Sequence, residues 1–150
     1  MRFVVFLLSL YSSLGYASNL QNIQIHQYSA ATYYVDVSVG DQQAEPFLID
    51  TGASHVTVTN ETIEKLAKQG KAIYLKHLSA VLADGSSIDI PVYRVSTLRV
   101  GDMCAFQDVE VAVVPDGTRC VLGLSALKHA APFVFSVEPP QLQVSNCTAT

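Results

Sequence analysis

The sequence predicts an all-β domain that carries one or two short helices. Short segments alternate apolar and polar side chains with the period of a half-buried strand, and turn-forming residues separate most of them. Only residues 59–70 and 120–131 carry a helical spacing or composition. The chain has 150 residues, 49% of them hydrophobic, which is enough for one core, and no linker or low-complexity segment divides it.

The first predicted strands bring Asp50 to the end of a hairpin. Residues 22–26 and 33–40 alternate clearly, and the second of these segments places three valines on one face. Residues 40–43 supply a turn, after which residues 45–50 return as a strand that ends at Asp50.

A short surface helix is predicted at residues 59–70. Thr59 can cap its first turn, Ile63 and Leu66 share one face, and Gly70 can end it.

Three hairpins are predicted in the rest of the chain. The first covers residues 73–95 with a tight turn at residues 83–86, and the second covers residues 97–115 with a turn at Gly101. The third covers residues 133–145 and closes the domain.

The first residues predict an export signal that is not part of the fold. Arg2 precedes an apolar run at residues 3–10, and small residues end at Ala17. The run is too short to span a bilayer comfortably, so we expect a cleaved signal peptide over residues 1–17 and a single domain over residues 18–150. The mature protein would then be periplasmic or secreted; an uncleaved N-terminal membrane anchor is the alternative.

The charge and the cysteine count exclude several partners. The formal net charge is -4 and there is no basic patch, which argues against nucleic acid or anionic lipid as the main partner. Export would place Cys104, Cys120 and Cys147 in an oxidising space, where three cysteines allow at most one intrachain disulfide. Burial of all three as thiols is the alternative. Neither the cysteines nor the four histidines have a metal-ligand spacing, so we expect no metal and no cofactor.

The segment PFLIDTGASHVTV, residues 46–58, carries the strongest chemical signal. Asp50 directly follows three apolar residues, although a buried carboxylate is costly unless it is hydrogen-bonded or put to use. Gly52 frees the backbone for a close approach and leaves an N–H group aimed at that carboxylate. Asp50 could instead only cap the tight turn through its own backbone.

Two further segments accompany this turn. VLADGSSI, residues 81–88, is predicted as a hairpin, and VLGLS, residues 121–125, opens a helix. Together with the D-T-G turn they resemble the retroviral-type aspartic proteases, the retropepsins, and especially their bacterial exported relatives, over residues 33–144. The resemblance implies a closed retropepsin-like barrel and an aspartic endopeptidase that hydrolyses peptide bonds.

The resemblance also implies that Asp50, Thr51 and Gly52 form the catalytic motif, with Thr51 tying two active-site loops together. Aspartic proteolysis needs two carboxylates that share one proton. The chain contains a single D-[ST]-G motif. Asp84 and Asp116 also lie next to a glycine, but the glycine follows directly and no serine or threonine stands between. A homodimer that supplies Asp50 twice at its two-fold axis is therefore implied, with a peptide or protein as substrate.

Substrate contacts follow from the same resemblance. The VLADGSSI segment is similar to the flap that folds over bound peptide, so Ala83, Asp84 and Gly85 are candidate substrate-binding residues. Ala83 and Asp84 stand at the tip in place of the glycine-rich retroviral sequence. An apolar lining, which would favour apolar side chains on both sides of the scissile bond, is expected from Val56, Val81, Leu82, Ile88 and Val121.

Residues around the catalytic motif complete the candidate site. Ala53 and Val121 are expected to bind substrate, and Ala53 lacks the hydroxyl that many pepsin-like enzymes place beside the catalytic carboxylate. Gly123 is expected to allow close packing behind the turn, with Val121 and Leu122 buried.

Two other functions fit the same residues. A catalytically inactive relative in the cell envelope could bind an extended peptide by strand addition without cleaving it. An envelope structural protein could assemble covalently through its cysteines.

Overall fold

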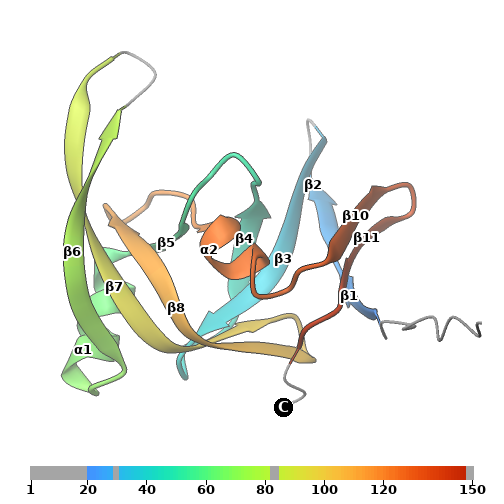
Figure 1. Ribbon diagram of the computed structural model, residues 1–150, viewed down its shortest axis with the longest axis horizontal. Helices are drawn as coiled ribbons and strands as arrows, with labels where there is room; N and C mark the ends of the chain where they lie inside the picture. Colours follow the sequence, from blue (N-terminus) through green and yellow to red (C-terminus); the bar gives the residue numbers. More distant parts are fainter. Residues whose placement is uncertain (1–19, 29–30, 82–84, 148–150) are drawn as a thin grey trace, which may run out of the picture.

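The computed structural model describes residues 20–28, 31–81 and 85–147, which fold into an all-β domain with two short helices (Figure 1). The strands are β1 (Gln21–Gln24), β2 (His26–Tyr28), β3 (Thr32–Val39), β4 (Glu45–Ile49), β5 (Val56–Thr59), β6 (Ala72–Val81), β7 (Ser87–Val100), β8 (Cys104–Val114), β9 (Val121–Leu122), β10 (Phe133–Val137) and β11 (Pro140–Val144). The helices are α1 (Asn60–Lys68) and α2 (Leu124–Leu127). No helix in this part of the chain is long and apolar enough to cross a membrane. The predicted fold class is confirmed, whereas the predicted signal peptide lies outside the described residues.

Six strands pair into a closed ring. The larger sheet has the order β2-β3-β4-β9-β5-β8-β7-β6, and β3 also pairs with β7, with Val37 opposite Val100. The pairings therefore run from β3 through β4, β9, β5, β8 and β7 back to β3, as a closed barrel requires. β2 and β6 extend the sheet beyond the ring.

The core fills this ring, as the alternation along β3 predicts. Val35, Val37 and Val39 are buried, and Phe47 of β4 and Leu98 of β7 belong to the same apolar cluster. Taking each such side chain out of water contributes roughly 1.5–3 kcal/mol. The residues between the three valines remain at least partly exposed, so the alternation matches the two faces of the strand.

Helix α1 begins and ends close to its predicted limits. The Thr59 hydroxyl accepts a hydrogen bond of 3.4 Å from the backbone amide of Thr62. Ile63 and Leu66 are buried against the ring, and Gly70 leaves the helix with a φ of +71°.

Two predicted segment limits are wrong. Residues 22–26 do not form one strand, because β1 joins β11 in a separate sheet while β2 pairs with β3, and the chain changes sheet at the buried Ile25. The hairpins predicted at residues 73–95 and 97–115 share one continuous strand, β7, which pairs with both β6 and β8. Apolar alternation shows neither feature, because both depend on which strand lies alongside.

The β6–β7 hairpin stands clear of the ring. The outer parts of β6 and β7 rise above the rest of the domain in Figure 1, where they are drawn in yellow-green. β7 pairs with β8 only from Val92 onward, so within the described residues the outer part of the hairpin is paired only between β6 and β7.

A smaller sheet, β1-β11-β10, packs beside the ring and is tied to it by a disulfide. Cys104 at the start of β8 pairs with Cys147, which follows β11. Cys120 is a buried free thiol, and burial together with the nearby Glu45 carboxylate raises its pKa to about 12. One pair within the chain and one buried thiol do not favour covalent assembly between chains.

Candidate active site

The D-T-G turn, residues 50–55, connects β4 to β5 and is closed by the backbone. The amide of Gly52 donates a hydrogen bond of 2.8 Å to Oδ1 of Asp50, as the sequence predicts. The amide of Ala53 donates to the Asp50 carbonyl at 3.3 Å. A methyl group at position 52 would lie 3.1 Å from Oδ1 of Asp50, so a larger residue would press on the carboxylate.

Strand β9 holds the two ends of this turn together. It lies between β4 and β5, with Val121 opposite both Leu48 of β4 and Thr57 of β5. The amide of Asp50 donates to the Leu122 carbonyl at 3.2 Å, and the amide of Val121 donates to the Thr57 hydroxyl at 2.9 Å. The position of Asp50 is therefore set by a segment that follows it by some seventy residues in the sequence.

Gly123 packs directly against the back of the turn. A methyl group at this position would lie 2.8 Å from the carbonyl oxygen of Ala53 and closer still to the carbonyl of His55. The next residue, Leu124, donates its amide to the same Ala53 carbonyl at 2.9 Å. The predicted close packing of the VLGLS segment behind the turn is confirmed, and only glycine fits there.

The buried Ser125 hydroxyl binds the backbone at the C-terminal end of the turn. It accepts a hydrogen bond of 2.8 Å from the amide of Val56 and donates one of 2.7 Å to the carbonyl of Glu110 on β8. The hydroxyl thus uses its single donor and one of its acceptor lone pairs, and it ties α2 to both β5 and β8.

The exposure of the predicted residues is mixed. Asp50 and Ala53 are half-buried, and Thr51 is exposed, as an accessible site requires. Leu122 is buried as expected, but Val121 is only half-buried, because neighbouring side chains of a strand point to opposite faces and Leu122 takes the core face of β9. A half-buried Val121 remains able to touch a ligand.

The hairpin residues of the predicted site are described only in part. Leu82, Ala83 and Asp84 lie outside the described residues. Gly85 is exposed and has a φ of +82°, which suits the end of a tight turn. Ile88 is 42% exposed and is available to a ligand, whereas Val56 is fully buried, so the prediction that Val56 lines a cleft is wrong. Its alternation places it on the core face of β5.

A cluster of charged side chains lies between the D-T-G turn and the β6–β7 hairpin. The Glu110 carboxylate is 3.3 Å from Nζ of Lys76 on β6 and 3.6 Å from Nε2 of His55 in the turn. Partial burial is the largest influence on the Glu110 carboxyl and acts to raise its pKa. The hydrogen bond and charge of Lys76, followed by the charges of His55 and Lys128, outweigh it and hold the pKa of Glu110 below its usual value.

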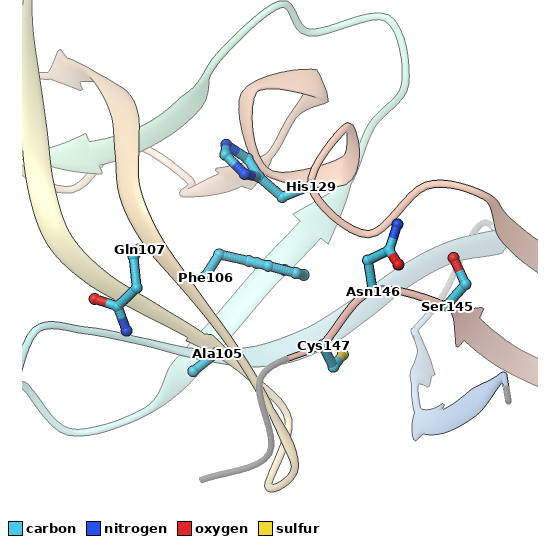
Figure 2. Close-up of a pocket in the computed structure, with 7 residues that line it drawn as sticks. All are labelled: Ala105, Phe106, Gln107, His129, Ser145, Asn146 and Cys147. Carbon is cyan, nitrogen blue, oxygen red and sulfur yellow. The ribbon is translucent and has the colours of Figure 1, made fainter. Parts of the chain in front are cut away.

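The hollow drawn in Figure 2 lies elsewhere, beside the disulfide. Its volume is about 450 Å³, and it contains none of the predicted site residues; its lining is Ala105, Phe106, Gln107, His129, Ser145, Asn146 and Cys147. The side chains of Ser145 and Asn146 donate to the carbonyls of Ala130 and Ala131, and the His129 ring lies against Phe106. These polar groups hold the C-terminal segment in place, so the hollow is a weaker candidate for the active site than the D-T-G turn. In the described part of the chain, no three His, Cys, Asp or Glu side chains could together hold a metal ion.

Comparison with known proteins agrees with this geometry. Residues 35–129 match the profile of a family described as gag-polyprotein putative aspartyl protease. The chain belongs to this family. The match includes the D-T-G turn, the β6–β7 hairpin and β9, which are the segments that build the site.

The fold of this aspartyl protease family member is also seen in a solved structure. It is similar to the crystal structure of a retropepsin-like aspartic protease from Rickettsia conorii, with a TM-score of 0.62 and 21% identity over 87% of this chain and 95% of that one. This likeness confirms the retropepsin-like fold. No curated protein matches the chain significantly.

Sequence reasoning missed the residues that support the site. Glu110 belongs to no motif, Ser125 enters only as the last residue of the VLGLS segment, and His55 is one of four histidines without a metal-ligand spacing. Their roles depend on contacts between β8, α2 and the turn, which no local pattern contains. The available signals were the position of His55 three residues after Gly52 and the place of Ser125 in the VLGLS segment.

Proposed function

We propose that the protein is an aspartic endopeptidase whose two catalytic carboxylates are Asp50 from each of two copies. The observation that carries this proposal is the D-T-G turn itself. Asp50 lies half-buried on a turn that β9, Gly123 and Ser125 hold from behind, and Thr51 beside it is exposed. An aspartate that merely caps a turn needs no such support.

One copy holds only half of the chemistry. Among the described residues, the Gly52 amide is the one hydrogen-bond donor to the Asp50 side chain, and it uses Oδ1. The second oxygen can share a proton with an identical carboxylate across a two-fold axis. The sequence offers no second D-[ST]-G motif that could take this place within the chain.

The proposed reaction adds water across a peptide bond. One Asp50 carboxylate takes a proton from the water, and the water oxygen bonds to the scissile carbonyl carbon. At the same time the protonated Asp50 of the other copy donates its proton to the carbonyl oxygen. Breakdown of this tetrahedral species breaks the C–N bond, and the amine leaves with a proton from the dyad. Thr51 would tie the two turns together across the dimer.

The β6–β7 hairpin supports a preference for apolar peptides. Leu78 lies opposite Ile90, and Ile88 is two residues further out on the same face of the hairpin. This face continues into Val92, which is fully buried, so it is the face that turns towards the ring. Peptide side chains bound beneath the hairpin would therefore meet apolar surface.

The β10–β11 hairpin supports a second copy as the partner. β10 is the edge strand of the smaller sheet, and it exposes Val134, Phe135 and Val137 by 47%, 38% and 54%. In Figure 1 the D-T-G turn and the outer parts of β6 and β7 lie towards the upper side of the domain, and the β10–β11 hairpin, on the right, rises towards the same side. A second copy on this side would cover the apolar edge and bring the two Asp50 residues together.

We further propose that the domain works outside the cytoplasm. The Cys104–Cys147 disulfide supports this location, because such bonds persist in oxidising compartments. Cell fractionation and N-terminal sequencing of the mature protein test it; a cytoplasmic chain that begins at Met1 would contradict it.

The proposed activity is tested by Asp50→Asn in a peptide-library assay, with and without pepstatin. Hydrolysis should disappear in the variant and in the inhibited wild type, because a neutral amide cannot activate water. Asp108→Asn is the matched control, since Asp108 is exposed on β8 at a φ of +55°, which asparagine also tolerates. A wild type that binds peptide without cleaving it would support a binding module and contradict the protease.

A further inference from the structure

The charged cluster around Glu110 lies on β8 and contacts two parts of the proposed protease, the D-T-G turn and the β6–β7 hairpin. Lys76 belongs to β6, the outer strand of the β6–β7 hairpin, and His55 belongs to the D-T-G turn. The Glu110 carboxylate on β8 contacts both, at 3.3 Å and 3.6 Å. We call Glu110, Lys76 and His55 the Glu110 cluster.

The backbone of Glu110 is itself fixed to the turn. Its carbonyl oxygen accepts the hydroxyl of Ser125, which in turn accepts the amide of Val56 at the end of the turn. The Glu110 side chain, which is 32% exposed, therefore extends from an ordered backbone position, and a displacement of the hairpin reaches the turn through few intermediate groups.

The neighbours of the Glu110 carboxylate favour its ionised form. Lys76 approaches it from β6, His55 from the turn and Lys128 from the segment after α2. The Ser54 hydroxyl lies 2.9 Å from Nδ1 of His55, which leaves Nε2 facing Glu110. At 3.6 Å this contact is electrostatic, and it is an ion pair only when His55 is protonated.

We infer that Glu110 is a positioning residue of the proposed reaction, which aligns the β6–β7 hairpin with the D-T-G turn through Lys76 and His55. Glu110 is not expected to touch the reacting atoms. The inference rests on the proposed protease function for its kinetic effect, but the alignment itself is a property of the folded chain.

The kinetic test is Glu110→Gln, which removes the charge and keeps the shape. We expect kcat to fall about three- to tenfold, while KM changes less than about twofold, because misalignment of a reacting group acts mainly on the transition state. Glu61→Gln is the matched control, since Glu61 forms an exposed ion pair with Lys65 on α1, away from the site. Lys76→Gln should reproduce the fall in kcat, whereas Lys76→Arg, which keeps the charge, should retain most of the activity. The double variant Glu110→Gln/Lys76→Gln should lose no more activity than either single variant, because both changes remove the same contact.

The pH profile separates alignment from simple folding support. The pKa of Glu110 lies below its usual value, so the ratio of wild-type to Glu110→Gln rates should stay above one at all pH values at which Glu110 is ionised. As the pH falls through the pKa of Glu110, the wild type loses the same contact, and the ratio should approach one. A ratio that stays constant to the acid limit would overturn the inference.

Hydrogen exchange tests the alignment without any catalysis. Deuterium uptake in residues 50–56 and 72–81 should rise in Glu110→Gln and in Lys76→Gln, and should stay at the wild-type level in Glu61→Gln. If uptake in these segments is unchanged in both cluster variants, or if kcat of an active enzyme is unchanged, the inference is wrong. If the wild type has no activity but deuterium uptake still rises in the two cluster variants, the alignment is supported and the proposed protease function is contradicted.

Discussion

The D-T-G turn and the β6–β7 hairpin approach the same proposed cleft, but they are built differently. The turn is held by β9 on both sides, by Gly123 from behind and by the buried Ser125 hydroxyl. The outer part of the hairpin is paired, among the described residues, only within itself, and Ile88 on it is 42% exposed. The difference indicates that the proposed catalytic group is fixed by the fold, whereas the outer part of the hairpin, its proposed cover, is held by fewer neighbours and could respond to a substrate.

The largest effect should come from a change behind the turn. Gly123→Ala would push a methyl group into the carbonyls of Ala53 and His55, which are backbone atoms that cannot move aside cheaply. We expect the free energy of unfolding to fall by about 3 kcal/mol, the upper range for overpacking. Chemical denaturation measures this. Gly117→Ala is the control: Gly117 has a φ of +79° but open space around it, so it should lose only about 1 kcal/mol. Equal losses would show that the turn is not packed tightly.

Loss of the Ser125 hydroxyl should have the next largest effect. Ser125→Ala leaves the buried amide of Val56 and the carbonyl of Glu110 without their shared partner. Stability should fall by about 1–3 kcal/mol, the usual cost of a buried unsatisfied group. Thermal and urea unfolding of this variant can be compared with Ser96→Ala, at an exposed position on β7. A change below about 0.5 kcal/mol in Ser125→Ala would contradict the proposed role of the hydroxyl.

A hydroxyl added beside Asp50 should change the pH dependence of the reaction. In Ala53→Ser the new hydroxyl can donate to the carboxylate pair and favour its ionised form. Both limbs of the pH–rate profile should move towards acid by up to about one pH unit, the scale of a single hydrogen bond. The limbs belong to the coupled pair and not to one Asp50. Limbs that remain in place would show that residue 53 does not tune the site.

The smallest effect is expected on the hairpin. Ile88→Ala should lower kcat/KM for peptides with apolar flanking residues by about threefold, with little change in stability, because the side chain is already largely exposed. Ile73→Ala is the matched control, since Ile73 is 61% exposed on β6 at the other end of the hairpin. A library profile that prefers charged residues on both sides of the scissile bond would contradict an apolar cleft.

The sequence predicted the parts of this protein that depend on local pattern. The alternation of Val35, Val37 and Val39, the helix after Thr59 and the turn at Gly52 each follow from neighbouring residues, and the structure confirms them. The family resemblance then correctly joined the D-T-G turn to the VLGLS segment. Local pattern alone could not have done so, because β9 pairs with β4 across a long separation in the sequence.

The remaining features depend on three-dimensional neighbours. The change of sheet at Ile25 and the Cys104–Cys147 pairing both follow from which elements lie alongside one another. The contacts of Glu110 belong to the same class, since a single carboxylate on a strand carries no spacing signal. Tertiary packing decides such features, and the sequence pattern is silent on them.

The central claim is that one active site needs two copies of Asp50, and a subunit-mixing titration tests it most directly. Wild-type protein at fixed concentration is equilibrated with increasing amounts of the Asp50→Asn chain, and peptide hydrolysis is measured alongside the solution mass. If only pairs of wild-type chains are active and the chains pair at random as dimers, activity should fall to about one half at an equal amount and to about one tenth at a ninefold excess of the variant. Activity that stays constant throughout the titration, or a species of monomer mass that cleaves peptide, would contradict the shared site.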